Sequence, residues 1–232
     1  MDQETTPAWL ERVNRLALTS ALLSTTVLEV NNALQVISGS AEMLNPASTP
    51  DVIAKRGEAI GAHARRASAL LAELSAFARD ESTHAAALDV GRVAQRALTM
   101  RQYTLAKLKI DSSFESSGET RTVIANQRLF LQIVLNLLVN AEQALGAKGG
   151  GRILVSVRSD GRNVVLSIED DGAGIPADRV PRLFTVDPSS NVRLGIGLAV
   201  ARELARRYGG DLVYSPRPGG GSQFSLTMPA AS

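Results

Sequence analysis

The feature that most constrains this 232-residue chain is a seam of mainly apolar and small residues that begins at Trp9 and ends at Leu44. Its members follow one another at alternating steps of four and three residues, which is the heptad spacing of a helix packed in a bundle. They are Trp9, Val13, Leu16, Ser20, Leu23, Val27, Val30, Leu34, Ile37, Ala41 and Leu44. The polar stretch that follows contains Pro46 and Pro50, so we expect the helix to end there.

A second apolar stripe between Ile53 and Ala78 predicts a second long helix, and the short turn predicts an antiparallel hairpin. A hairpin alone buries the stripes of both helices poorly, so we expect two copies to pair as a homodimeric four-helix bundle. Residues 1–80 are therefore predicted to form a helical-hairpin dimerisation domain, and the polar, Ala-rich residues 81–88 a connector.

Beyond the connector the pattern changes to mixed helix and strand, which predicts an α+β chain with a second domain over residues 89–232. Asp89 is a suitable cap for a helix that reaches about Leu108. A strongly apolar helix is expected from Gln127 to Leu145, ended by glycines. The other expected elements are a strand over 109–114, a hairpin of 153–159 and 163–169 with Asp160-Gly161 at its turn, a helix over 196–208 and a strand pair of 211–215 and 222–228.

Composition excludes several kinds of chemistry. The chain has no cysteine, which excludes disulfides, cysteine-ligated zinc, iron–sulfur centres and a thiol nucleophile. Its net charge of +2 argues only weakly for a nucleic-acid partner, and none is expected. No run approaches the ~18 apolar residues of a membrane span, and the acidic start is unlike a signal peptide. We therefore expect a soluble, cytoplasmic protein.

Three segments of the second domain carry candidate chemistry. Asn136 and Asn140 lie four residues apart on the apolar helix, so both amides share one face. An amide in so apolar a helix needs a partner, which is either a ligand or a neighbouring loop that it caps.

The other two segments are rich in glycine. Asp170-Asp-Gly-Ala-Gly-Ile-Pro176 directly follows a predicted strand, and its glycines permit close approach of a ligand to the backbone. Arg193-Leu-Gly-Ile-Gly-Leu198 opens a predicted helix, whose free N–H groups favour phosphate. Each segment alone is equally compatible with an ordinary turn or cap.

In this order and spacing, the three segments resemble the N, G1 and G2 boxes of the histidine-kinase and related ATPase superfamily. Arg182-Leu-Phe184 is similar to the F box, and Gly219–Phe224 resembles the terminal glycine-rich hairpin. The resemblance covers about residues 88–230 and implies an α/β sandwich that binds ATP with Mg²⁺ under a lid.

The resemblance also implies a role for each matching residue. The implied roles are a magnesium ligand for Asn140, a polar partner near the phosphates for Asn136, recognition of the adenine amine for Asp170, contact with the base for Gly172 and Gly174, and a phosphate cradle for Gly195 and Gly197. The related topoisomerase, mismatch-repair and chaperone ATPases carry Glu at the position of Asn136. Because Asn cannot act as a general base, transfer to a protein side chain is favoured over hydrolysis. The lid departs from the family in two ways: the stretch 185–191 is atypical, and Arg193 replaces a glycine, where it either reaches phosphate or remains solvated.

Residues 12–44 resemble the dimerisation and phosphoacceptor helix of sensor histidine kinases. The stretch Leu28-Glu-Val-Asn-Asn-Ala-Leu34 follows the H-box order, but Leu28 stands where the family has its phosphoacceptor His, and Ala33 replaces Pro. Leucine has no nucleophilic atom and cannot accept a phosphoryl group. The heptad places Leu28 on the outer face, where it is either an isolated surface residue, a docking contact or a silencing substitution, natural or engineered.

The neighbouring Glu29 and Asn32 match positions that assist phosphorylation and dephosphorylation in the family, although both are also compatible with solvated helix surface. Neither His63 nor His84 is followed by an H-box pattern, and we expect both at the surface.

The sequence thus predicts a histidine-kinase-like, ATP-binding protein of two-component signalling. It is expected to be unable to phosphorylate its own H-box position and to act on a response regulator or on a partner's histidine. The alternatives are a non-catalytic pseudokinase that docks a regulator or heterodimerises, and, less favoured, a serine kinase of the anti-sigma-factor type.

Overall fold

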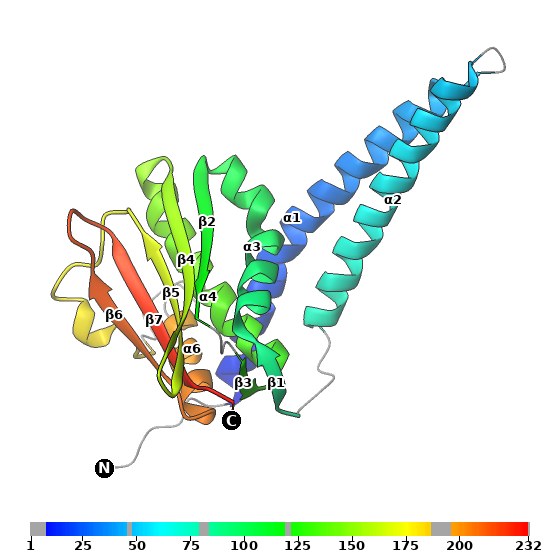
Figure 1. Cartoon of the computed structure of the whole chain (residues 1–232). Coiled ribbons are helices and arrows are strands. Elements are labelled where there is room, and N and C mark those ends of the chain that lie inside the picture. Colours follow the sequence, from blue (N-terminus) through cyan, green and yellow to red (C-terminus); the bar gives the residue numbers. More distant parts are fainter. Residues whose placement is uncertain (1–7, 46–47, 79–83, 119–121, 187–195, 232) are drawn as a thin grey trace. The chain divides into compact units, whose positions relative to one another are not determined.

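The computed structural model describes residues 8–45, 48–78, 84–118, 122–186 and 196–231 (Figure 1). The chain divides into two compact units. The hairpin unit comprises residues 19–80, and the C-terminal unit comprises residues 81–232 together with residues 1–18. The long first helix therefore contributes its beginning to the C-terminal unit and its remainder to the hairpin unit.

The elements follow one another as α1 (Ala8–Glu42), α2 (Pro50–Ala78), β1 (Ala86–Asp89), α3 (Val90–Lys107), β2 (Ile110–Ser117), β3 (Thr122–Ala125), α4 (Gln127–Lys148), β4 (Gly151–Asp160), β5 (Asn163–Asp170), the 3₁₀ turn η1 (Val180–Arg182), α6 (Gly197–Arg207), β6 (Asp211–Pro216) and β7 (Ser222–Pro229).

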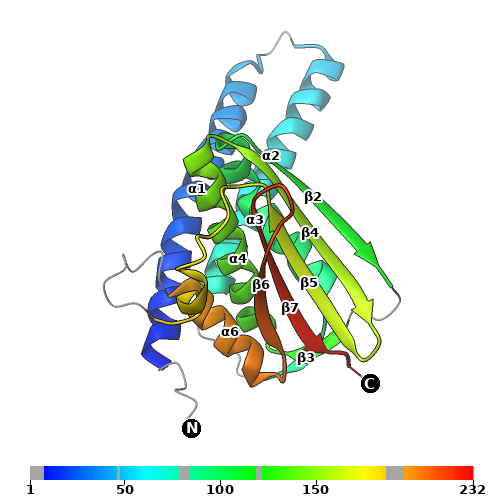
Figure 2. The same cartoon turned by 90° about the vertical axis from the view of Figure 1, so that its left-hand side faces the viewer.

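The C-terminal unit is a two-layer α/β sandwich. Its main sheet has the order β2-β4-β5-β7-β6, with β2 and β4 parallel and every other neighbouring pair antiparallel. Figure 2 shows this sheet in front, with α3, α4 and α6 behind it. Alternate residues of β4, such as Ile153, Val155 and Val157, are buried, whereas Arg152 and Arg158 are exposed. This alternation is expected of a sheet covered on one face.

Helix α4 is the central helix of this unit and packs against both α3 and α6. The Asn126 side chain caps its start by accepting from the amides of Arg128 and Leu129, and Gly149 ends it in the left-handed conformation at φ +93°. Among the described residues, α4 is the one helix with the length and apolarity to cross a membrane. Most of that stretch is buried in the domain, as expected of a core helix.

In the hairpin unit, α1 and α2 run antiparallel (Figure 1). Along α1, the buried residues Leu22, Thr26, Ala33 and Ser40 recur on one face. A neighbouring face leaves apolar seam residues exposed, namely Leu23, Val27 and Leu34. The predicted seam thus lies beside the buried face of α1, and within one chain none of its residues is fully buried.

The structure confirms the predicted fold class and its main helices and strands. Asp89 caps α3 as expected, accepting from the Arg92 amide at 3.0 Å. The prediction missed β1 and β3, which pair antiparallel as a separate two-stranded sheet. Consequently the last three residues of the predicted connector, 86–88, belong to a strand. Four-residue strands give too short an alternation to be recognised, and β1 begins with two alanines, which favour strands weakly.

Candidate functional site

Asp170 is the last residue of β5 and is almost fully buried, with 1% of its surface exposed. The Gly172 amide donates to its Oδ1 at 2.9 Å, and the Ser222 amide donates to the same carboxylate. Burial raises the pKa of Asp170 above its ordinary value, and the two backbone hydrogen bonds and the Arg217 guanidinium oppose that rise. Backbone amides thus hold the desolvated carboxylate of Asp170 in a fixed orientation.

Two glycines after Asp170 keep the backbone close to this carboxylate. A Cβ at Gly172 would lie 2.8 Å from Asp170 Oδ1 and 3.2 Å from the Ala144 Cβ, so no larger residue fits without a shift. Gly174 has φ +73°, a left-handed conformation that favours glycine. A Cβ at Gly221, which precedes β7, would clash with the Asp170 carbonyl, and Gly221 also has a left-handed φ of +98°.

The second cluster lies where α4 faces the start of α6. Asn136 of α4 is 5% exposed, and Gly197 is the first residue of α6. A Cβ at Gly197 would lie 3.1 Å from Asn136 Oδ1, which shows how closely the two elements approach here. The structure therefore brings together two predicted residues that are 61 positions apart in the sequence.

Asn140 follows Asn136 by one helical turn and is half-buried. Within the described part of the chain its amide makes no hydrogen bond. An amide oxygen suits a hard cation such as Mg²⁺, which prefers oxygen ligands. Mg²⁺ is usually bound by a few protein oxygens together with substrate phosphates. The described residues contain no group of three His, Cys, Asp or Glu side chains placed to hold a metal. Gly195 and Arg193 lie outside the described residues.

The beginning of the lid contacts α6 through an aromatic ring. The Arg202 guanidinium lies 4.7 Å from the centroid of the Phe184 ring, within cation–π range. Asp211 of β6 orients that guanidinium with two hydrogen bonds of 2.8 and 3.0 Å. Its hydrogen bond with Arg202 is the main reason that the pKa of Asp211 is lowered to about 2. Phe184, which is similar to the F-box phenylalanine, thus packs against an arginine that Asp211 holds in place.

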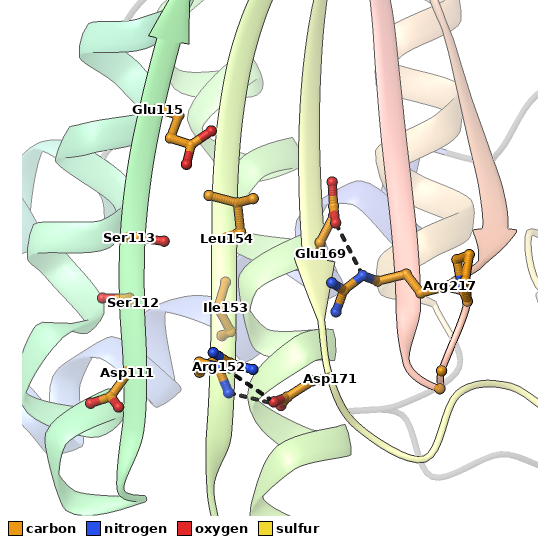
Figure 3. A pocket seen from close by; sticks show the side chains of 13 residues that line it. Asp111, Ser112, Ser113, Glu115, Arg152, Ile153, Leu154, Glu169, Asp171 and Arg217 are labelled. Atoms are coloured by element: carbon orange, nitrogen blue, oxygen red, sulfur yellow. Dashed lines mark hydrogen bonds and ion pairs between the residues drawn. The ribbon is translucent and has the colours of Figure 1, made fainter.

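A hollow of about 520 Å³ lies elsewhere, on the sheet face opposite the helices (Figure 3). Its lining contains none of the predicted nucleotide residues. Four carboxylates (Asp111, Glu115, Glu169 and Asp171) face it together with two arginines that already pair with acids. A net acidic wall disfavours an anionic ligand, so this hollow does not suit a nucleotide.

The predicted residues of the H-box region lie in the hairpin unit. Leu28 is 41% exposed and Asn32 is exposed. Glu29 accepts a hydrogen bond of 3.1 Å from Arg66 of α2, which leaves its side chain only 10% exposed. Of the two histidines, His63 is half-buried and His84 is exposed.

Sequence reasoning missed two polar residues at the Asn136 cluster. Asn14 of α1 and Gln132 of α4 are both buried and hydrogen-bonded there. The interruption of an apolar helix by Gln132 was a usable signal, because Gln132 precedes Asn136 by one turn. Nothing in the local sequence of α1 distinguishes Asn14.

The fold is an α/β sandwich in which glycines frame a buried carboxylate at the end of β5. Residues 125–232 match the family model described as "Histidine kinase-, DNA gyrase B-, and HSP90-like ATPase". This part of the chain is therefore a histidine-kinase-like ATP-binding domain of the kind found in two-component systems.

Proteins that are similar over nearly the whole chain are named as sensor proteins or sensor histidine kinases. It is 28% identical to the C4-dicarboxylate transport sensor protein DctS of Rhodobacter capsulatus, over 95% of this chain and 35% of that protein. It is 25% identical to the sensor histidine kinase ZraS of Escherichia coli, over 95% of this chain and 47% of that protein. The chain thus spans between a third and a half of these relatives.

Solved structures share the fold. The catalytic domain of histidine kinase ThkA matches with a TM-score of 0.57 at 23% identity, covering 63% of this chain and 96% of that domain. ThkA in complex with the response regulator TrrA matches with a TM-score of 0.55 at 20% identity, over 94% of this chain and 63% of that one.

Proposed function

We propose that this chain is a histidine-kinase-like protein that binds ATP with Mg²⁺ but cannot phosphorylate its own H-box position. It would act on a response regulator or on the histidine of a partner protein. The observation that carries the nucleotide assignment is Asp170, because a buried carboxylate held by two backbone amides is suited to accept from an exocyclic amine. The family match over 125–232 supports ATP as the ligand.

We assign to the surrounding residues the roles that the resemblance to the family implies. Gly172 and Gly174 would contact the base beside Asp170. Gly195 and Gly197 would present N–H groups to the phosphates at the start of α6. Asn140 would be the protein's ligand to Mg²⁺, and Asn136 a polar partner near the phosphates. Bound Mg²⁺ would neutralise charge on the phosphates.

The loss of self-phosphorylation rests on Leu28. Its side chain is accessible at the surface of α1, where a histidine would be reachable, but it offers no atom that can attack a phosphorus. Glu29 and Asn32 remain beside it. A response regulator docked here would meet the exposed Asn32, whereas Glu29 is held by Arg66; the exposure of Asn32 supports regulator dephosphorylation as one activity.

Nucleotide binding is tested by titrating a fluorescent ATP analogue with Mg²⁺ into the wild type, Asp170→Asn and Asp171→Asn. We expect the wild type to bind and Asp170→Asn to lose at least about tenfold in affinity, because an amide NH₂ replaces one carboxylate oxygen that accepts from adenine. Asp171→Asn is the matched control and should bind like the wild type, since Asp171 pairs with Arg152 on the other face. Absence of binding by the wild type would exclude the proposal.

Phosphotransfer is tested by restoring the missing acceptor. The wild type should take up no label from γ-labelled ATP, whereas Leu28→His should become labelled, and Leu28→Gln should stay unlabelled as a control for polarity. Label on His63 or His84 of the wild type would contradict the claim that self-phosphorylation is lost.

A second candidate is a non-catalytic docking module, favoured by the exposure of Leu28, which offers an apolar contact to a partner. This reading predicts regulator binding that is unaffected by Asp170→Asn. A serine kinase of the anti-sigma-factor type is disfavoured, because those proteins lack the long hairpin and resemble the subfamily with Glu at the position of Asn136.

We also propose that the chain forms a homodimer through the hairpin and works in the cytoplasm, where ATP is available. The support for the dimer is the exposed seam of α1, including Leu23, Val27 and Leu34. These residues recur at heptad spacing, and a second copy of the same helix would cover them.

A further inference from the structure

The start of α1 is docked on the proposed nucleotide-binding elements, although residues 9–18 lie far from them in the sequence. The Asn14 amide nitrogen donates to Asn136 Oδ1 at 2.9 Å, and the Asn136 nitrogen donates back to Asn14 Oδ1 at 3.0 Å. Gln132 also donates to Asn14 Oδ1, at 2.7 Å. All three side chains are buried, with exposed fractions of 4% for Asn14, 5% for Asn136 and 0% for Gln132.

This reciprocal pair leaves Asn136 no free path to a ligand. Asn14 uses one acceptor site and one donor of the Asn136 amide, and the side chain as a whole is only 5% exposed. The space beside Gly197 is equally limited, since a Cβ there would lie 3.1 Å from Asn136 Oδ1 and 3.7 Å from the Asn14 nitrogen. A phosphate that contacts Asn136 therefore needs the place that Asn14 occupies.

Further contacts hold the same segment. Glu11 accepts a hydrogen bond of 2.8 Å from Arg207 at the end of α6, and its carbonyl accepts from Gln132 at 3.3 Å. Leu10 is 4% exposed, whereas the adjacent Trp9 is 60% exposed, so one face of the segment is buried and the other is open.

The cluster of Asn14, Gln132 and Asn136 also leaves one hydrogen-bond acceptor without a partner when the segment is docked. Gln132 Oε1 is buried and has no hydrogen-bond partner. A buried acceptor without a partner costs free energy, which makes the docked arrangement easier to exchange for another.

We infer that residues 9–18 of α1 act as an intramolecular latch that competes with the nucleotide for Asn136. This inference rests on the proposed function, because it requires that the nucleotide contacts this amide. Since coupling between two binding events is reciprocal, a docked segment lowers nucleotide affinity and bound nucleotide releases the segment. Asn14 is the positioning residue of the latch.

The first test weakens the latch without removing the helix. In Asn14→Asp an oxygen replaces the nitrogen that donates to Asn136 Oδ1, so two oxygens face each other in a buried place. We expect nucleotide affinity to rise by at least about fivefold, the lower end of typical coupling between sites. Arg12→Gln is the matched control, because it changes the charge by the same amount at an exposed position of the same segment. Added negative charge alone would weaken binding of an anionic nucleotide, so an increase in affinity identifies release of the latch.

The second test reads the segment directly and leaves its polar contacts intact. Because the chain has no cysteine, Leu10→Cys and Trp9→Cys each place a single thiol on the segment. Mg²⁺ and a non-hydrolysable ATP analogue should speed the reaction of the Cys at position 10 with a thiol reagent at least about fivefold. The Cys at position 9 should react equally fast with and without nucleotide.

The outcomes separate the two proposals. If the wild type binds nucleotide but position 10 reacts no faster and Asn14→Asp binds no tighter, the latch is excluded and the nucleotide site stands. If the wild type binds no nucleotide, the proposed function fails and the latch fails with it.

Discussion

At the residue scale, the buried carboxylate of Asp170 affects the stability of the fold. A carboxylate whose pKa is raised in the folded state binds its proton more tightly than in the unfolded chain. Its contribution to stability is therefore present below the unfolded pKa and lost as the pH rises through the folded pKa. At neutral pH the ionised Asp170 lowers the free energy of unfolding.

Because the ionised Asp170 lowers the free energy of unfolding, its replacement by a neutral residue should have a predictable effect on thermal unfolding. The variant should be more stable than the wild type at pH 7, and the difference should shrink as the pH is lowered towards 4. Nucleotide affinity of the wild type should fall over the same acid range, because a protonated acid has lost part of its acceptor capacity. Calorimetry from pH 4 to 8, with Asp171→Asn as control, checks this; a variant less stable than the wild type at pH 7 would contradict it.

At the element scale, α3 and α4 are joined by a buried ion pair. Arg101 donates from Nε and Nη2 to the Glu142 carboxylate at 2.8 and 2.5 Å, and each side chain is 5% exposed. Neutralising one partner leaves the other charge buried without compensation.

We therefore expect Glu142→Gln to lower the free energy of unfolding by about 3–5 kcal/mol, measured by urea denaturation. Glu203→Gln is the control, because Glu203 pairs with Arg207 near the surface at 4.0 Å and should change stability by less than about 0.5 kcal/mol. Replacing both partners as Arg101→Met with Glu142→Leu should recover most of the loss. If Glu142→Gln and Glu203→Gln lowered the free energy of unfolding equally, burial of the Arg101–Glu142 ion pair would not explain its contribution to stability.

Most elements could be predicted because their signals are local. The apolar run of α4 lies between a capping Asn126 and Gly149, and the turn after β4 contains Gly161 at φ +60°. The site was predictable for the same reason where its motif is contiguous, as at Asp170 to Gly174. The contact of Asn14 with Asn136 joins positions 122 apart through a shape complementarity that no local pattern encodes.

At the scale of the whole molecule, the exposed seam of α1 predicts an assembly. Val27 is 45% exposed on the seam, and its neighbour Leu28 is 41% exposed on the outer face. We expect Val27→Glu to shift the chain from dimer to monomer in light scattering, because four-helix packing would bury the new charge. Leu28→Glu should leave the dimer intact. Equal effects of the two substitutions would argue against the seam as the interface.

Gly221 has a consequence for how this chain can vary. It lies 51 positions after Asp170 and contributes no side chain to any ligand, yet only a residue without Cβ can pass so close to the Asp170 carbonyl. The hairpin before β7 also brings the Ser222 amide to the carboxylate. In a library of random variants selected for ATP binding, position 221 should therefore tolerate as few replacements as position 170 itself.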